Sequence, residues 1–116
     1  MLAEQIRNNL SANARLPIAD ESLEKAAVVI AIVDEPSGEK TPCFLLTRRA
    51  STLRTHAGQF ALPGGKLDKG EDAMQAALRE LHEELGVVAH EKDILGLLDD
   101  YPTRSGFCIT PVIVWV

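Results

Sequence analysis

The amino-acid sequence predicts an α/β fold in a single domain, and three observations carry this prediction. Runs rich in β-branched residues recur along the chain, as is typical of buried strands. Two other segments place their apolar residues at helical spacing. The chain has 116 residues, of which 46% are hydrophobic and 25% charged, and this composition suits one folded domain with a modest core.

The first half of the chain predicts a helix followed by a strand hairpin. Leu2, Ile6 and Leu10 recur every four residues and mark one face of a short amphipathic helix. The run KAAVVIAIV predicts a buried strand, and a turn-like segment separates it from the run PCFLLT. The predicted elements are a helix over 2–10, strands over 25–33 and 42–47, a loop over 48–58 and a brief strand over 59–62.

The second half contains the clearest helix, over residues 72–85. This segment is rich in Ala and Leu, is acidic at its start and stops at Gly86, which favours a left-handed C-cap. The apolar runs 94–101 and 107–116 predict two more strands. Because a domain seldom ends on an apolar edge strand, we expect the domain over 1–116 to be a fragment without its C-terminal elements.

Charge and composition exclude several classes of function. The net charge of −5, from 17 acidic and 12 basic residues, argues against nucleic-acid binding, and it would also repel a phosphate substrate unless a divalent cation were present. No apolar run is long enough to span a membrane and no signal peptide is visible, so we expect a cytoplasmic protein without membrane contact. Cys43 and Cys108 lie in strand-like runs and predict small buried thiols.

Three glutamates of the 72–85 helix fall beside its apolar stripe. Each residue turns the helix by about 100°, so with Ala73 at zero the stripe extends to about 140°. Glu84 then lies at about 20°, Glu80 at about 340° and Glu83 at about 280°. The apolar stripe consists of Ala73, Met74, Ala77, Leu78, Leu81 and Leu85.

A solvated acidic face explains this arrangement poorly. Like charges three and four residues apart repel, and half-burying an unpaired carboxylate is costly. A hard cation such as Mg²⁺ resolves both problems, because it takes oxygen ligands and is commonly held by a few carboxylates together with substrate phosphates.

The same helix carries a motif that resembles a known family. Gly65 is followed after five residues by Glu71, and after seven more by RELHEELGV over residues 79–87. This pattern resembles the Nudix box at every defined position, with Pro63 and Gly64 directly ahead of it. The resemblance implies an α/β/α sandwich with a mixed sheet, in which the box forms a loop, a helix and a second loop.

The resemblance also implies roles for individual residues. The metal ligands would be Glu80, Glu83 and Glu84, with the carbonyl of Gly64 as a further ligand, and the ion would be Mg²⁺ or, in its place, Mn²⁺. The chemistry would be hydrolysis of a diphosphate linkage by a metal-activated water. The general base stays open, because several Nudix enzymes take it from a loop after the box.

The remaining box residues would position these ligands. Glu71 and Arg79 resemble the structural ion pair of the family, which holds the loop on the helix. Gly65 would adopt a backbone conformation that other residues resist, and Gly86 would cap the helix in the left-handed region.

A second resemblance narrows the substrate to coenzyme A. The chain is similar to the coenzyme A pyrophosphatase branch of Nudix hydrolases, although Leu62 stands where that branch usually has Phe. The expected products are 3′,5′-ADP and phosphopantetheine or an acyl form of it. The substrate-binding candidates are Arg48, Arg49, Arg54 and His56, which would bind phosphate groups. The similar segments are LLTRRA (45–50), LRTHAGQ (53–59), PGGKLD (63–68), LD (98–99), TRSGF (103–107) and TPV (110–112).

Other interpretations stay open at this point. The three arginines could be ordinary solvated loop residues. The substrate could be ADP-ribose, a dinucleotide or a nucleoside triphosphate. The chain could also be a nucleotide-binding module of Nudix fold without turnover, although such modules often lose box glutamates and all are present here. A homodimer is compatible with the family and with an exposed final strand.

Overall fold

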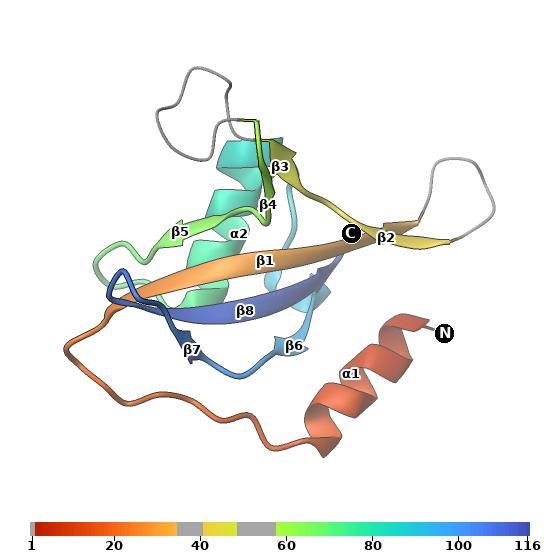
Figure 1. Ribbon diagram of the computed structural model, residues 1–116. Coiled ribbons are helices and arrows are strands. Elements are labelled where there is room, and N and C mark those ends of the chain that lie inside the picture. Colours follow the sequence, from red (N-terminus) through yellow and green to blue (C-terminus); the bar gives the residue numbers. More distant parts are fainter. Residues whose placement is uncertain (1, 35–40, 49–57) are drawn as a thin grey trace.

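The computed structural model describes residues 2–34, 41–48 and 58–116, which form a mixed β-sheet with two α-helices (Figure 1). The main sheet follows the order β2-β1-β8-β6, with β5 paired to β1 and β7 paired to β8, while β3 and β4 form a separate ribbon. The α/β prediction is therefore confirmed. The elements are α1 (Leu2–Ala12), β1 (Glu24–Asp34), β2 (Pro42–Phe44), β3 (Thr47–Arg48), β4 (Phe60–Ala61), β5 (Gly64–Lys66), α2 (Ala73–Leu85), a 3₁₀-helix (Glu91–Asp93), β6 (Ile94–Leu97), β7 (Tyr101–Pro102) and β8 (Phe107–Trp115).

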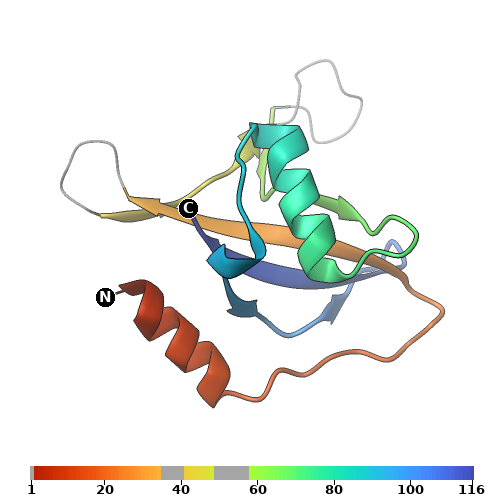
Figure 2. The same ribbon diagram turned by 180° about the vertical axis from the view of Figure 1, so that it is seen from behind.

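The hydrophobic core lies between α2 and the two central strands. β1 and β8 run parallel, and all other pairings of the main sheet are antiparallel. Ala27, Val29 and Ala31 alternate along β1 and are fully buried against α2. Val112 and Val114 take the same position on β8. Helix α2 lies behind β1 in Figure 1 and in front of it in Figure 2, so it covers one face of the sheet.

Helix α1 packs at the other end of the sheet, against β6. Leu10 lies over Gly96, where a Cβ atom would come within 2.7 Å of the leucine side chain. The segment that follows α1 is held by the buried carboxylate of Asp100, which accepts hydrogen bonds from Arg15 and from the backbone N–H of Ile18 at 3.0 Å. The N-terminal segment is thus fastened to the sheet next to β7.

Two of the predicted strands are interrupted. The run 42–47 divides into β2 and β3, because after Leu45, whose N–H still donates to Ala31, the chain leaves β1 to pair with β4. The run 94–101 divides into β6 and the start of β7, since Asp99 and Asp100 between them bind the segment after α1. The prediction of an uninterrupted strand was wrong in both places.

The last strand and one cysteine also differ from expectation. β8 is a central strand paired to β1 on one side and to β6 and β7 on the other, so it is not an edge. Cys108 is buried as predicted, whereas Cys43 is exposed because the short β2 has no buried residue. None of the helices in the described part of the chain is long and apolar enough to cross a membrane.

Candidate functional site

Both ends of α2 are fixed by caps. The side chain of Asp72 accepts a hydrogen bond from the backbone N–H of Gln75 at 2.8 Å, and the side chain of Gln75 accepts one from the N–H of Asp72 at 2.9 Å. At the other end Gly86 adopts φ 68° and ψ 15°, and its N–H donates to the carbonyl of His82. The predicted left-handed cap at Gly86 is confirmed, and the reciprocal N-cap fixes where the helix starts.

The buried side of α2 is rotated from the predicted stripe. Ala76, at about 300° on the helical wheel, is fully buried, so the buried sector is centred near Glu80 and Glu84. Glu80 is accordingly the most enclosed of the three glutamates, with 14% of its side chain exposed against 56% for Glu83. Glu84 lies one turn further along the helix and is exposed. Four members of the predicted stripe are only half buried, namely Ala73, Met74, Leu78 and Leu85.

Glu71 and Arg79 form a two-point ion pair. The Nε and Nη2 atoms of Arg79 donate to the two carboxylate oxygens of Glu71, each at 2.9 Å. Arg79 Nη2 also donates to the carbonyl of Lys66 at 3.1 Å, which ties the loop to the helix. These hydrogen bonds lower the pKa of Glu71 and raise that of Arg79. Both side chains are at least three-quarters buried, so the pair is stronger than a typical surface contact.

The same guanidinium also binds two of the glutamates proposed as metal ligands. Arg79 Nη1 donates to Glu80 at 2.9 Å and to Glu83 at 3.2 Å. Within the described residues no three His, Cys, Asp or Glu side chains converge as they would in a closed metal cage. The arrangement is instead an open row of carboxylates, which suits Mg²⁺, because this ion keeps waters and uses substrate phosphates as further ligands.

The backbone of β5 brings two glutamates to one edge. The N–H of Gly64 donates to Glu84 Oε2 at 3.0 Å. A Cβ atom on Gly65 would lie 2.4 Å from Glu80 Oε1, and one on Gly64 would lie 2.3 Å from the carbonyl oxygen of Ala27. The backbone contact excludes a side chain at Gly64, whereas at Gly65 a side chain would displace the Glu80 carboxylate. Gly65 lies in a strand and has no positive φ, so the expectation of an unusual backbone conformation there was wrong.

The carbonyl of Gly64 faces the same edge. In an antiparallel pair the N–H and C=O of one residue point to the same side. Since the N–H of Gly64 points to Glu84, away from β1, its carbonyl points there too. The donor set at this edge is therefore a backbone carbonyl beside carboxylates, which is chemically suited to a divalent cation with oxygen ligands.

The predicted substrate residues are only partly described. Arg49, Arg54 and His56 lie outside the described residues. Arg48 is exposed on β3, with its guanidinium 5.8 Å from the ring centre of Phe60. The Arg48 side chain is thus accessible to solvent on the β3–β4 ribbon, which leads into β5.

Two residues near this edge were missed by sequence reasoning. Lys66 lies with its Nζ atom 5.4 Å from the ring centre of Phe107. The sequence gave no sign of this contact across the 40 residues that separate Lys66 from Phe107, because it depends on β5 and β8 flanking the same strand. The only feature of the sequence that could have drawn attention to Lys66 is its position directly after Gly64 and Gly65.

Comparison with known proteins identifies the family. The family model of the NUDIX domain matches residues 23–115. An uncharacterised Nudix hydrolase, NudL, of Pectobacterium atrosepticum is 43% identical over 90 residues, which is 77% of this chain and 45% of that protein. NudL of Yersinia enterocolitica is 45% identical over 89 residues, 76% of this chain and 44% of that protein. The chain thus spans about half the length of the curated relatives it matches.

Solved structures agree on the fold. A MutT/nudix family protein from Enterococcus faecalis superposes with a TM-score of 0.69 at 21% identity, covering 100% of this chain and 44% of that one. The MutT protein from Methanosarcina mazei matches with a TM-score of 0.53 at 28% identity, covering 83% of this chain and 65% of that one. The mixed sheet with α2 on one face is the fold these proteins share.

Proposed function

Because the chain belongs to the Nudix family, we propose that it is part of an enzyme that uses a divalent metal ion to hydrolyse the diphosphate linkage of a nucleotide derivative. The observation that carries the proposal is the edge of β5, where the backbone of Gly64 and Gly65 meets the carboxylates of Glu84 and Glu80. Glu71 and Arg79 hold this loop on α2.

The residues at this edge have different roles in the proposed reaction. Glu80, Glu83, Glu84 and the carbonyl of Gly64 would hold Mg²⁺, with Mn²⁺ as a substitute. When bound, the ion would neutralise charge on the phosphate oxygens and lower the pKa of a bound water. Arg79 keeps Glu80 and Glu83 oriented, because its Nη1 atom donates hydrogen bonds to both carboxylates.

We take coenzyme A, or an acyl form of it, as the substrate, with 3′,5′-ADP as one product. The support is the sequence similarity to the coenzyme A pyrophosphatase branch, together with Arg48, an exposed cation on the ribbon that continues into the site. The departure at Leu62 concerns the shape of the substrate site and leaves the carboxylates unchanged. A cytoplasmic location and a homodimer stay predictions.

A substrate panel tests the proposal. The protein is incubated with coenzyme A, ADP-ribose, NADH and 8-oxo-dGTP, each with Mg²⁺ or with EDTA, and the products are identified by mass. Release of 3′,5′-ADP that disappears with EDTA supports both the metal site and the substrate. Metal-dependent cleavage of another compound would retain the hydrolase and eliminate coenzyme A. Binding without turnover would identify a nucleotide-binding module instead.

A further inference from the structure

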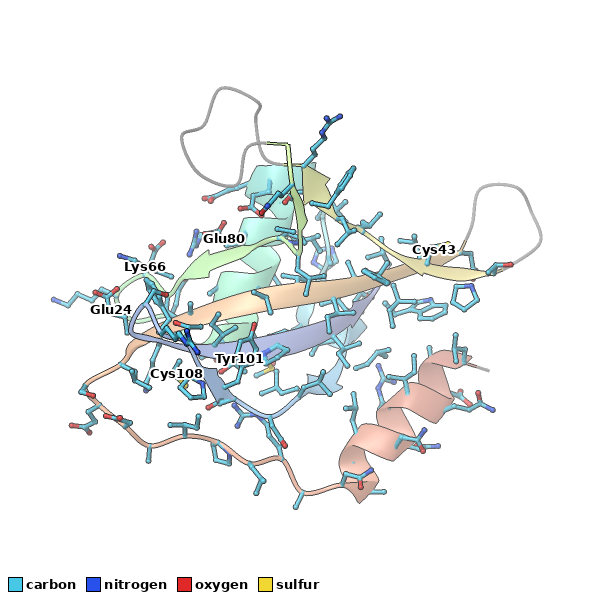
Figure 3. The ribbon with its side chains drawn as sticks, in the orientation of Figure 1. Glu24, Cys43, Lys66, Glu80, Tyr101 and Cys108 are labelled. Carbon is cyan, nitrogen blue, oxygen red and sulfur yellow. The ribbon has the colours of Figure 1, made fainter. Side chains whose placement is uncertain are left out.

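The guanidinium of Arg79 lies between two groups of acceptors. On the side of the loop after β5, its Nε and Nη2 atoms donate to Glu71 and to the carbonyl of Lys66. On the side of α2, Nη1 donates to Glu80 and Glu83, two of the proposed metal ligands. Figure 3 labels one residue of each group, Lys66 on β5 and Glu80 on α2. A guanidinium has five N–H groups, and these hydrogen bonds use all of them.

A further carboxylate, that of Asp68, lies on the loop side of this guanidinium. Asp68 Oδ2 is 3.2 Å from Arg79 Nε, whose hydrogen bond goes to Glu71 at 2.9 Å. Asp68 therefore contributes charge rather than another hydrogen bond. Its side chain is 68% exposed, so water and salt weaken this contact. In the sequence it lies within the five-residue spacer between Gly65 and Glu71, where the box motif defines no residue.

The backbone of the loop fixes the position of Asp68. The N–H of Asp68 donates to Glu71 Oε1 at 2.8 Å, and the carbonyl of Asp68 accepts from the N–H of Glu71 at 3.0 Å. The two residues thus close a turn in both directions. This turn brings the two carboxylates to the same edge of the guanidinium.

We propose that Asp68 is a positioning residue that acts through Arg79 and raises the affinity of the neighbouring carboxylates for the metal ion. The inference rests on the proposed function. Arg79 is a cation beside Glu80 and Glu83, so its charge opposes the binding of a second cation there. Glu71 balances that charge once, and Asp68 adds a second negative charge. Asp68 also attracts the guanidinium toward the loop, which leaves the oxygens of Glu80 and Glu83 more accessible to the ion.

The test removes the charge of Asp68 while keeping its shape. Asp68→Asn retains both backbone hydrogen bonds of the turn, and Asp68→Glu restores the charge on a longer side chain. The matched control is Asp34→Asn, which removes an exposed carboxylate at the other end of β1 from the strand's pairing with Lys66.

Three properties are measured for each variant. Binding of Mn²⁺ is followed without substrate by the electron paramagnetic resonance signal of the free ion. It is measured in about 0.1 M and about 1 M KCl, where the Debye length is roughly 10 Å and 3 Å. Coenzyme A hydrolysis gives kcat and the Mg²⁺ concentration for half-maximal rate, and thermal unfolding in EDTA reports on the fold.

We expect Asp68→Asn to weaken Mn²⁺ binding about threefold at the lower salt concentration, within the roughly 1.4- to 5-fold that an exposed ion pair corresponds to. The difference disappears at the higher salt concentration, because exposed charges are then screened. Asp68→Glu and Asp34→Asn bind Mn²⁺ like the unaltered protein. In Asp68→Asn the Mg²⁺ concentration for half-maximal hydrolysis rises by the same factor, while kcat at saturating Mg²⁺ stays within about twofold.

Several results would overturn the proposal. They are normal Mn²⁺ binding by Asp68→Asn, a loss that persists at the higher salt concentration, an equal loss in Asp34→Asn, and failure of Asp68→Glu to restore binding. A lower kcat or unfolding temperature of Asp68→Asn with unchanged Mn²⁺ binding would assign Asp68 a structural role instead.

The outcomes also separate this inference from the proposed function. A protein whose Mn²⁺ binding depends on Asp68 but which cleaves no diphosphate supports the role of Asp68 and refutes the hydrolase. A protein that cleaves coenzyme A only with Mg²⁺, yet binds Mn²⁺ equally well in Asp68→Asn, refutes the role of Asp68 and supports the hydrolase. An unaltered protein that binds no Mn²⁺ overturns both.

Discussion

Gly64 and Gly65 are adjacent, yet replacing each with alanine is expected to have different consequences. A Cβ atom on Gly64 would lie 2.3 Å from the carbonyl oxygen of Ala27 and 2.9 Å from the Cα atom of Val28. Both are backbone atoms of the central strand β1 and cannot move away alone. The three heavy atoms nearest to a Cβ atom on Gly65 all belong to the carboxylate of Glu80, with Oε1 at 2.4 Å. This group is the end of a flexible side chain and can swing aside.

The two costs can be estimated from these contacts. Overpacking against a rigid backbone costs about 1–3 kcal/mol, so Gly64→Ala should lower the unfolding temperature by roughly 4–15 °C. In Gly65→Ala the Glu80 carboxylate is displaced by about 1 Å and its 2.9 Å hydrogen bond from Arg79 is strained. A displacement of that size in a catalytic group reduces turnover by about 100-fold. The stability of Gly65→Ala should change by about 1 kcal/mol or less, since Arg79 keeps its two bonds to Glu71.

The measurement combines thermal unfolding by circular dichroism in EDTA with initial rates of diphosphate hydrolysis in Mg²⁺. Gly65→Ala should unfold near the temperature of the unaltered protein and be nearly inactive. Gly64→Ala should be the less stable of the two. The steric reasoning is refuted if Gly64→Ala is as stable as the unaltered protein, or if Gly65→Ala retains full activity.

Three further perturbations have defined outcomes. Arg79→Lys should lower kcat by roughly 100-fold, because lysine cannot reproduce the two-point bond to Glu71 while also holding the other glutamates; a rate within twofold would contradict this role. Asp72→Ala should destabilise the protein by about 1 kcal/mol in urea unfolding without changing kcat, since it removes only the N-cap of α2. Burial opposes the ionisation of Asp100, but hydrogen bonds from Thr110 and Ile18 and the charge of Arg15 outweigh it, so its pKa is lowered. This carboxylate therefore stabilises the fold above its unfolded pKa of about 3.9, and the contribution is lost as the pH falls through the lower folded value. Asp100→Asn should be less stable by about 1.5–3 kcal/mol at pH 7, with a gap that narrows below about pH 4; a gap that is constant with pH would argue against this charge.

The sequence predicts the elements that local signals encode. The caps of α2 at Asp72 and Gly86 depend on residue types with strong positional preferences, and the helix begins and ends there. The strand over 25–33 is long and β-branched, and β1 covers it. The breaks at residues 45–46 and 98–100 escaped prediction, because they arise from pairing partners distant in the sequence.

The sequence predicted which residues belong to the candidate site better than it predicted how they are arranged. Box spacing selected Glu71, Arg79 and the three glutamates, and the ion pair between the first two is present. The predicted apolar stripe left out position 76, since alanine counts little as an apolar signal, although Ala76 is fully buried. The contact between Lys66 and Phe107 could not be predicted, because only the sheet order brings β5 and β8 to the same strand.

The central claim is that the carboxylates at the β5 edge bind the metal ion that drives diphosphate hydrolysis. It is tested most directly by the rate of coenzyme A hydrolysis as a function of Mg²⁺ concentration, in the unaltered protein, in Glu84→Gln and in the control Glu91→Gln, whose side chain lies on the exposed 3₁₀-helix. We predict a Mg²⁺-dependent rate that falls by at least about 100-fold in Glu84→Gln and is unchanged in Glu91→Gln. Turnover that persists in EDTA, or a Glu84→Gln protein as active as the control at every Mg²⁺ concentration, would contradict the claim.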